Sequence, residues 1–229
     1  MYLTAMTTVT DAMHFRISTR AFAPTEVPES TIRDLLDTAR WSPSGGNTQP
    51  WKVIVVAGEE RDSIVTLAQQ ALSNNPRGEA GNYPLYPAHL WEPHRSRRYN
   101  LGEEMYDLLG IDRGNKAGRL GHLARNYQFF DAPVGMFFVI DERMGHGQWA
   151  HLGMFMQSLA LTATERGLAT CFQEAWGTVR ATLKAHFDLA ANEVLYCGMA
   201  LGYPDPDAPV NRLRSTRAEV DEFATFRGF

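Results

Sequence analysis

The sequence predicts a single compact domain in which amphipathic helices alternate with short buried strands. Its 229 residues, 44% of them hydrophobic and 21% charged, suit one domain that buries a sizeable core. Residues 28–39 place a proline in a first turn and then an apolar residue every three to four positions, which predicts a helix. Residues 53–57 form a β-branched run that ends at Gly58 and predicts a buried strand.

The second half of the chain predicts one long helix and three further strands. Residues 133–140, 168–172 and 194–202 are short apolar runs, each typical of a strand that is buried on both faces. The helix predicted over 148–165 is apolar almost all round, and a helix without a polar face must be covered on every side. In a domain of this size, we expect a second subunit to supply part of that cover.

The segment 40–51 between the first helix and the first strand predicts a ligand cradle. Small residues there let backbone N–H groups approach a ligand, and the amides of Asn47 and Gln49 can both donate and accept hydrogen bonds. The alternative is a helix cap and turn that Asn and Gln side chains merely hold together.

Two arginine clusters predict the binding of an anion. Arg16, Ser18 and Arg20 lie within five residues, and Arg212 and Arg214 follow a proline-rich turn near the other end of the chain. Guanidinium groups and hydroxyls suit phosphate, and alternation in an extended segment would direct both members of the second cluster to one face. For either cluster alone, a solvated basic surface is the competing interpretation.

Residues 74–130 are rich in Pro, Gly, Tyr, Trp and Arg, and we interpret them as an excursion from the core that forms a lid over an active site. A basic helix is expected from Pro93 to a stop at Gly110. Aromatic faces beside guanidinium groups suit a flat anionic ring, so the hypothesis is an aromatic carboxylate substrate, with a solvated basic helix as the alternative. Arg95 and Arg98 are three apart and share a face, whereas Arg97 points elsewhere. The candidate substrate contacts are Tyr86, Trp91, Arg95 and Tyr99.

Charge and composition argue against several classes of partner. A formal charge of −4 gives no reason to expect nucleic acid or an anionic membrane surface. No signal sequence and no run of 18 apolar residues is present, so we expect a soluble cytoplasmic protein. Cys171 and Cys197 stand alone in apolar stretches and predict buried free thiols, and the histidines show no ligand spacing that would indicate a metal site.

Four motifs in this order resemble the FMN-dependent nitroreductase family over nearly the whole chain. They are Arg16-x-Ser18-x-Arg20-x-Phe22, then residues 42–51 (SPSGGNTQPW), then Gly198-x-Ala200-Leu201-Gly202-Tyr203-Pro204, then Arg212-x-Arg214. The excursion with Trp91, Pro93, Arg95 and Arg98, the stop at 109–111 and the C-terminal Phe-Arg-Gly-Phe look most like the bacterial nitrobenzoate-reductase branch.

The resemblance implies an α+β fold with a central mixed, mostly antiparallel sheet flanked by helices, assembled as an intertwined homodimer with two FMN molecules at the interface. It also implies cofactor contacts from three parts of the chain and from the partner. Arg16, Ile17, Ser18 and Arg20, with Arg212 and Arg214, would hold the phosphate, ribityl chain and pyrimidine edge. Pro43, Ser44, Gly45 and Asn47 would reach the flavin of the partner, and Phe172, Gln173 and Glu174 would form a turn over the ring, with Arg98 as a further candidate. Ile17 stands where many relatives have a basic residue, and Phe172 replaces a frequent proline.

The family's activity agrees with what the sequence lacks. The chain shows no Ser-His-Asp order, no paired carboxylates at a convincing spacing and no G-x-G-x-x-G loop, so a cofactor would carry the chemistry. The resemblance implies that NADH or NADPH donates hydride and leaves before a nitroaromatic or quinone binds in its place, in a ping-pong mechanism. The same scaffold could instead serve reductive dehalogenation, flavin fragmentation or oxidation of an activated C–C bond, or bind FMN without catalysis.

Overall fold

The centre of the molecule is a four-stranded sheet with the strand order β1-β2-β4-β3. The structure is a computed structural model that describes residues 8–79 and 83–229. Its strands are β1 (Lys52–Ala57), β2 (Val134–Asp141), β3 (Ala169–Gln173) and β4 (Glu193–Gly202). All three pairings are antiparallel, and one isolated parallel bridge joins Ser18 to Thr170 of edge strand β3. The predicted sheet is confirmed.

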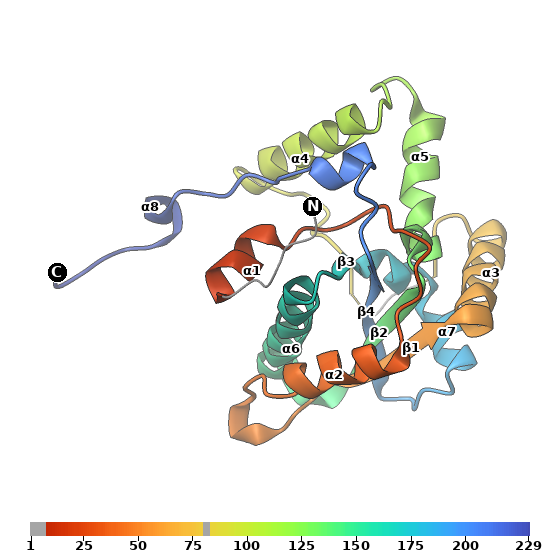
Figure 1. Cartoon of the computed structure of the whole chain (residues 1–229), viewed down its shortest axis with the longest axis horizontal. Coiled ribbons are helices and arrows are strands. Elements are labelled where there is room, and N and C mark those ends of the chain that lie inside the picture. The colour runs from red at the N-terminus through yellow and green to blue at the C-terminus, as the bar shows by residue number, and fades with distance from the viewer. Residues whose placement is uncertain (1–7, 80–82) are drawn as a thin grey trace.

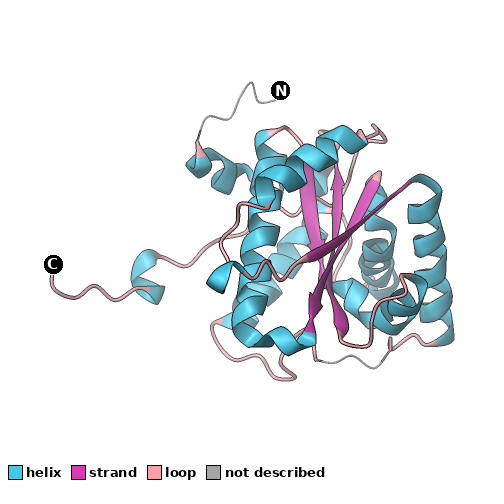
Figure 2. Cartoon of the chain, turned by 90° about the horizontal axis from the view of Figure 1, so that it is seen from below, coloured by secondary structure: helices cyan, strands magenta, loops and turns pink. Residues whose placement is uncertain are grey.

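Helices cover both faces of this sheet (Figures 1 and 2). On one face α2 (Glu29–Ala39) packs against α6 (Gly145–Glu165), and on the other α3 (Gly58–Asn74) packs against α7 (Arg180–His186). The remaining α-helices are α1 (Val9–Phe15), α4 (His94–Leu108), α5 (Lys116–Ala124) and α8 (Val220–Phe223). Short 3-10 helices are η1 (Gly45–Asn47), η2 (Arg125–Asp131), η3 (Glu142–Met144), η4 (Glu174–Val179) and η5 (Pro209–Arg212).

Strand β2 divides the core into two layers because successive side chains of a strand point to opposite faces. Met136 and Phe138 pack with α2 and α6, whereas Phe137 and Val139 pack with α3, η2 and α7. Every residue of β2 before Asp141 is buried, so the side chains on both faces of the strand are covered. This explains why the strand reads as a continuous apolar run in the sequence.

Helix α6 begins three residues earlier than the sequence indicated, at Gly145. Its Leu152, Phe155 and Leu159 are buried against the sheet, but Met154 on the opposite side is 46% exposed. Part of this apolar helix is therefore left uncovered by its own chain. The sequence interpretation did not assign α3 or α5.

The chain leaves the body at its C-terminal end. Leu213 is still buried, and the residues after it extend away from the domain through α8 to the C-terminus (Figure 1). This arm carries three exposed aromatic residues, Phe223, Phe226 and Phe229. Among the residues that the structure describes, no helix is both long and apolar enough to cross a membrane.

Candidate cofactor and substrate site

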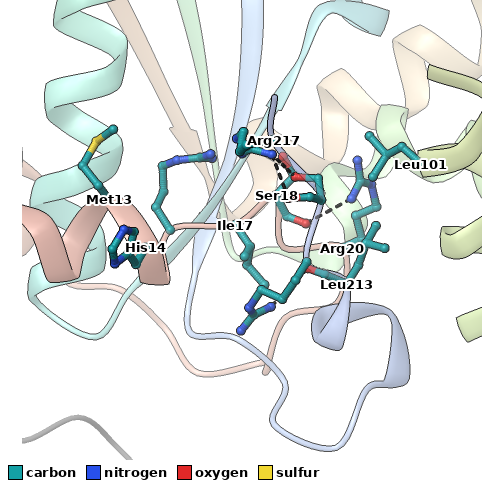
Figure 3. A pocket seen from close by; sticks show the side chains of 11 residues that line it. Met13, His14, Ile17, Ser18, Arg20, Leu101, Leu213 and Arg217 are labelled. Carbon is teal, nitrogen blue, oxygen red and sulfur yellow. Dashed lines mark hydrogen bonds between the residues drawn. The ribbon is translucent and has the colours of Figure 1, made fainter. Parts of the chain in front are cut away.

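The first arginine cluster is anchored on edge strand β3. The Thr19 amide donates to the carbonyl of Thr170 at 3.0 Å, and the Thr19 side chain is buried. Because side chains alternate along an extended segment, Arg16, Ser18 and Arg20 project to the opposite side from Thr19. All three line one cavity of about 460 Å³ (Figure 3).

This cavity, which we call the arginine cavity, collects four guanidinium groups. Arg16 and Arg20 come from the segment after α1, and Arg214 and Arg217 from the C-terminal segment. None of the four forms an ion pair with a carboxylate in the parts of the chain that the structure describes. Burial lowers the pKa of Arg16, and the nearby charge of Arg217 lowers it further. A bound anion would offset the repulsion among these four positive charges and accept hydrogen bonds from them.

Arg212 does not line this cavity. Residues 209–212 form η5 rather than an extended segment, yet Arg212 and Arg214 still face one common space. Arg212 lies at a neighbouring cavity of about 250 Å³, which also includes Ile17 and Arg214. Arg217 takes its place in the arginine cavity. Arg217 could have been found in the sequence as the third arginine of the run Arg-Leu-Arg-Ser-Thr-Arg at 212–217.

The loop 43–47 lies against the first half of α6. The Gly45 amide donates to Nδ1 of His151 at 3.4 Å, and the Thr48 hydroxyl donates to Oε1 of Gln148 at 2.6 Å. Gly46 and Asn47 both have positive φ, so this tight turn needs the glycine that the sequence provides. Pro43, Ser44, Gly45 and Asn47 do not line the arginine cavity of their own chain.

The predicted turn after β3 is present, because β3 ends at Gln173 and η4 begins at Glu174. The Gln173 side chain is buried and donates to the Asn126 carbonyl at 2.8 Å. Phe172 packs on the core layer that the sheet forms with α2 and α6. These two side chains hold the turn in place. The Glu174 carboxylate accepts a hydrogen bond of 3.3 Å from the Tyr196 hydroxyl.

Tyr196 is the extra residue of a β-bulge in β4, where the register against β2 shifts between Phe138 and Val139. A bulge re-aims side chains, and here Tyr196 joins Tyr83 and Trp149 in the wall of an apolar cavity of about 530 Å³. Tyr83 stands edge-on to Trp149, with ring centres 5.5 Å apart. Burial raises the pKa of Tyr83 to about 12, so the phenol stays neutral. Tyr83 thus lies on this aromatic cavity and not among the arginines of α4.

Helix α4 covers a fourth cavity, of about 740 Å³, which we call the α4 cavity. It shares Arg20 and Leu101 with the arginine cavity, so the two spaces adjoin. Arg95 and Arg98 both line it, which confirms that they share one face of the helix, and Arg97 instead pairs with Glu222 at 2.9 Å.

The other predicted substrate residues are placed differently. Tyr99 lines the α4 cavity, and the ring of Tyr86 lies 4.2 Å from the guanidinium carbon of Arg98. Arg95 is paired with the Glu92 carboxylate at 2.7 Å. Trp91 is 61% exposed, packs edge-on against His94 and does not line the α4 cavity.

Cys171 and Cys197 are buried free thiols, as expected from the sequence. Burial raises the pKa of both thiols, which keeps them protonated and unreactive. Within residues 8–79 and 83–229, no three His, Cys, Asp or Glu side chains gather in a way that could hold a metal ion.

Fold and site together define an α+β protein with a cluster of arginines that have no carboxylate partner among the described residues, next to the α4 cavity. Comparison with known proteins places it more narrowly. The model of the nitroreductase family matches residues 13–203, and the chain belongs to this family.

Among curated proteins, a 4-nitrobenzoate reductase of Pseudomonas putida is 38% identical over 216 residues, covering 93% of both chains. A nitrobenzene nitroreductase of Ectopseudomonas oleovorans is 34% identical over 218 residues, covering 95% of this chain and 96% of that protein. Among solved structures, the FMN and NADPH-dependent nitroreductase NfnB of Sphingopyxis sp. strain HMH has a TM-score of 0.94 at 38% identity, covering 97% of this chain and all of that one.

Proposed function

We propose that the protein is an FMN-dependent NAD(P)H nitroreductase that binds FMN in the arginine cavity and reduces small nitroaromatic compounds. The observation that carries the proposal is the set of four guanidinium groups without carboxylate partners in the described chain. The relatives support it, because they include reductases of nitrobenzene and 4-nitrobenzoate and FMN- and NADPH-dependent enzymes.

The residues of the arginine cavity fit FMN. A phosphate monoester carries nearly two negative charges and several acceptor oxygens, which suit Arg16, Arg214 and Arg217 with the Ser18 hydroxyl. Arg212 would contribute from the neighbouring cavity, and Ile17 lines both cavities. Bound FMN would supply the hydride chemistry, and NADPH or NADH would supply the electrons.

Arg20 is suited to an electrostatic role in the reaction. It lines both the arginine cavity and the α4 cavity, and its Nη1 donates to the Ser18 carbonyl at 3.1 Å, which orients the guanidinium. A fixed cation at this junction would stabilise negative charge that develops on the cofactor or the substrate. The backbone N–H of Glu174, at the start of η4, is proposed as a further hydrogen-bond donor to the cofactor ring.

We propose that the active form is a homodimer in which loop 43–47 of one chain completes the cofactor site of the other. Three features support it: the loop does not line its own arginine cavity, Met154 leaves an apolar side of α6 exposed, and the C-terminal arm presents exposed phenylalanines. Interfaces between obligate subunits behave like a core cut in two and typically bury more than about 2,000 Å².

The chain is proposed to be one domain in which residues 74–130 form a lid. Helix α4 has no buried residue and contributes most of the wall of the α4 cavity, as expected of a cover. The α4 cavity would receive the acceptor, with Tyr99 of its wall for the ring and an arginine for a carboxylate substituent, and Tyr86, which does not line the cavity, would act by packing on Arg98.

The test is to purify the protein, record its flavin absorbance, and follow NADPH oxidation with and without nitrobenzene or 4-nitrobenzoate. A yellow protein that consumes NADPH only when a nitroaromatic is present, with reduced products recovered, would support the function. A protein that gains no flavin absorbance when titrated with FMN would overturn it.

A further inference from the structure

Helix α4 covers two cavities although the body of the protein holds it weakly. Leu101 faces both the arginine cavity and the α4 cavity, and Glu103 and Tyr106 line the α4 cavity. None of the residues of α4 is fully buried. Because burial of apolar side chains supplies most of the energy that fixes a helix, and Leu101, Met105 and Leu108 are only half-buried, polar contacts take a larger share in holding α4.

One of these contacts is a two-pronged ion pair to α5. Arg119 donates from Nη1 to Oε1 of Glu103 at 2.6 Å and from Nη2 to Oε2 at 3.2 Å. The two side chains are only 21% and 32% exposed, so water and salt screen this pair less than an open surface pair. The pair lowers the pKa of the Glu103 carboxyl and raises that of Arg119, as a persistent contact would.

The same arginine also packs on an aromatic ring of α4. Its guanidinium carbon lies 4.3 Å from the centre of the Tyr106 ring, within the range of a cation–π interaction. The ring of Tyr106 in turn meets buried His122 of α5 edge-on, with centres 6.1 Å apart. Arg119 therefore contacts α4 at Glu103 and Tyr106, which lie one turn apart and both line the α4 cavity.

A second ion pair near the start of α4 is weaker. Arg97 meets Glu222 of α8 at 2.9 Å, but both side chains are about half exposed, and exposed pairs contribute little. The Arg119 cluster is consequently the principal polar attachment of α4 to α5.

We propose that Arg119 is a positioning residue that holds α4 over the arginine cavity and the α4 cavity through Glu103 and Tyr106. Arg119 itself lines neither cavity, so it would act through its two partners. This inference rests on the proposed function, since it assigns the covered spaces to FMN and the nitroaromatic acceptor. Loss of the cluster would let α4 move away, releasing FMN faster and weakening acceptor binding.

The experiment compares wild type, Arg119→Ala, Glu103→Ala, the double variant and Arg119→Lys, each loaded with FMN. We expect Arg119→Ala to raise the FMN dissociation rate about tenfold and the KM for nitrobenzene several-fold, with kcat changed less than about twofold, as for loss of a charge-assisted hydrogen bond. The double variant should be no worse than Arg119→Ala, and Arg119→Lys should recover part of the loss. Hydrogen exchange should accelerate in α4 and not in α2.

Arg33→Ala is the matched control, because Arg33 forms a similar pair with Glu29 on the exposed surface of α2. Unchanged FMN dissociation and unchanged α4 exchange in Arg119→Ala would overturn the proposal, as would additive losses in the double variant. If Arg119→Ala melts far below wild type, Glu103→Ala and Arg119→Lys carry the same test. A wild type that binds no FMN would instead refute the proposed function, and hydrogen exchange would still report whether the cluster holds α4.

Discussion

The guanidinium carbon of Arg98 lies 4.2 Å from the centre of the Tyr86 ring, and Arg98 has no carboxylate partner within the described residues. Arg95, on the same face of α4, is instead paired with Glu92. An arginine that already holds a carboxylate is a poor receptor for a second one. The structure therefore favours Arg98 over Arg95 as the residue that would recognise an anionic acceptor.

Replacing Arg98 should change the choice between charged and neutral acceptors. In Arg98→Ala, the ratio of kcat/KM for 4-nitrobenzoate to that for nitrobenzene should fall by about tenfold or more, the effect of one lost hydrogen bond to a charged group. Arg95→Ala is the control and should leave the ratio within about threefold of wild type. A ratio that does not change in Arg98→Ala would show that this arginine does not bind the carboxylate, and a loss with both substrates would indicate a contact to the cofactor.

The arginine cavity should govern FMN affinity. Arg16→Ala, Arg214→Ala and Arg217→Ala should each weaken FMN binding by roughly 1.5–3 kcal/mol per charge-assisted hydrogen bond lost. Titration of the apoprotein, followed by quenching of flavin fluorescence, measures the dissociation constants. Arg212→Ala should have a smaller effect because Arg212 lines the neighbouring cavity. Equal losses for Arg212 and Arg217 would contradict the assignment.

Gly198 should be required for the packing of Trp176. A Cβ at Gly198 would overlap the buried indole ring, which is held between Phe129 and Phe137. Gly198→Ala should therefore destabilise the fold by about 1–3 kcal/mol through overpacking. Gly121→Ala on α5 is the matched control: nothing lies near its added Cβ, so it should stabilise by roughly 0.5–1 kcal/mol. Urea unfolding of the two variants would show opposite signs if the packing is as described.

The C-terminal arm should contribute to dimer stability. Removing residues 220–229 deletes three exposed phenylalanines and should raise the dissociation constant of the dimer while leaving Leu213 and Arg217 in place. Light scattering over a dilution series would detect the change. A full-length protein that stays a 25.7 kDa monomer when loaded with FMN would refute the dimer itself.

His122 should make the fold sensitive to acid. Burial, with help from Arg125 and Arg20, lowers the pKa of His122 from 6.5 to about 4. Between these values the unfolded chain binds a proton that the folded chain does not, so stability should fall as the pH drops from about 6.5 to 4. His122→Phe keeps a ring between Tyr106 and Phe130. It should reduce the loss in free energy of unfolding across this pH window by about 1–2 kcal/mol. Identical slopes for variant and wild type in urea unfolding at several pH values would exclude this role.

The sequence determined the features that depend on local pattern. The run 133–140 predicted β2 because a strand buried on both faces needs apolar side chains at every position. The basic helix after Pro93 and its stop at Gly110 followed from turn residues, and α4 ends at Leu108. The first arginine cluster followed from composition, since two guanidinium groups and a hydroxyl fall within five residues, and Arg16, Ser18 and Arg20 do line one cavity.

Tertiary structure alone decided what lies near these elements. Whether Arg212 or Arg217 enters the cavity depends on η5, a short helix whose geometry the sequence did not indicate. Tyr83 lies beside Tyr196, the extra residue of the bulge in β4, across a sequence separation of more than one hundred residues. Arg95 and Arg98 look equivalent on the helix face, and the structure shows that Arg95 pairs with Glu92 while Arg98 packs on the ring of Tyr86. Charges and rings act through distance in space, which the order of residues along the chain does not fix.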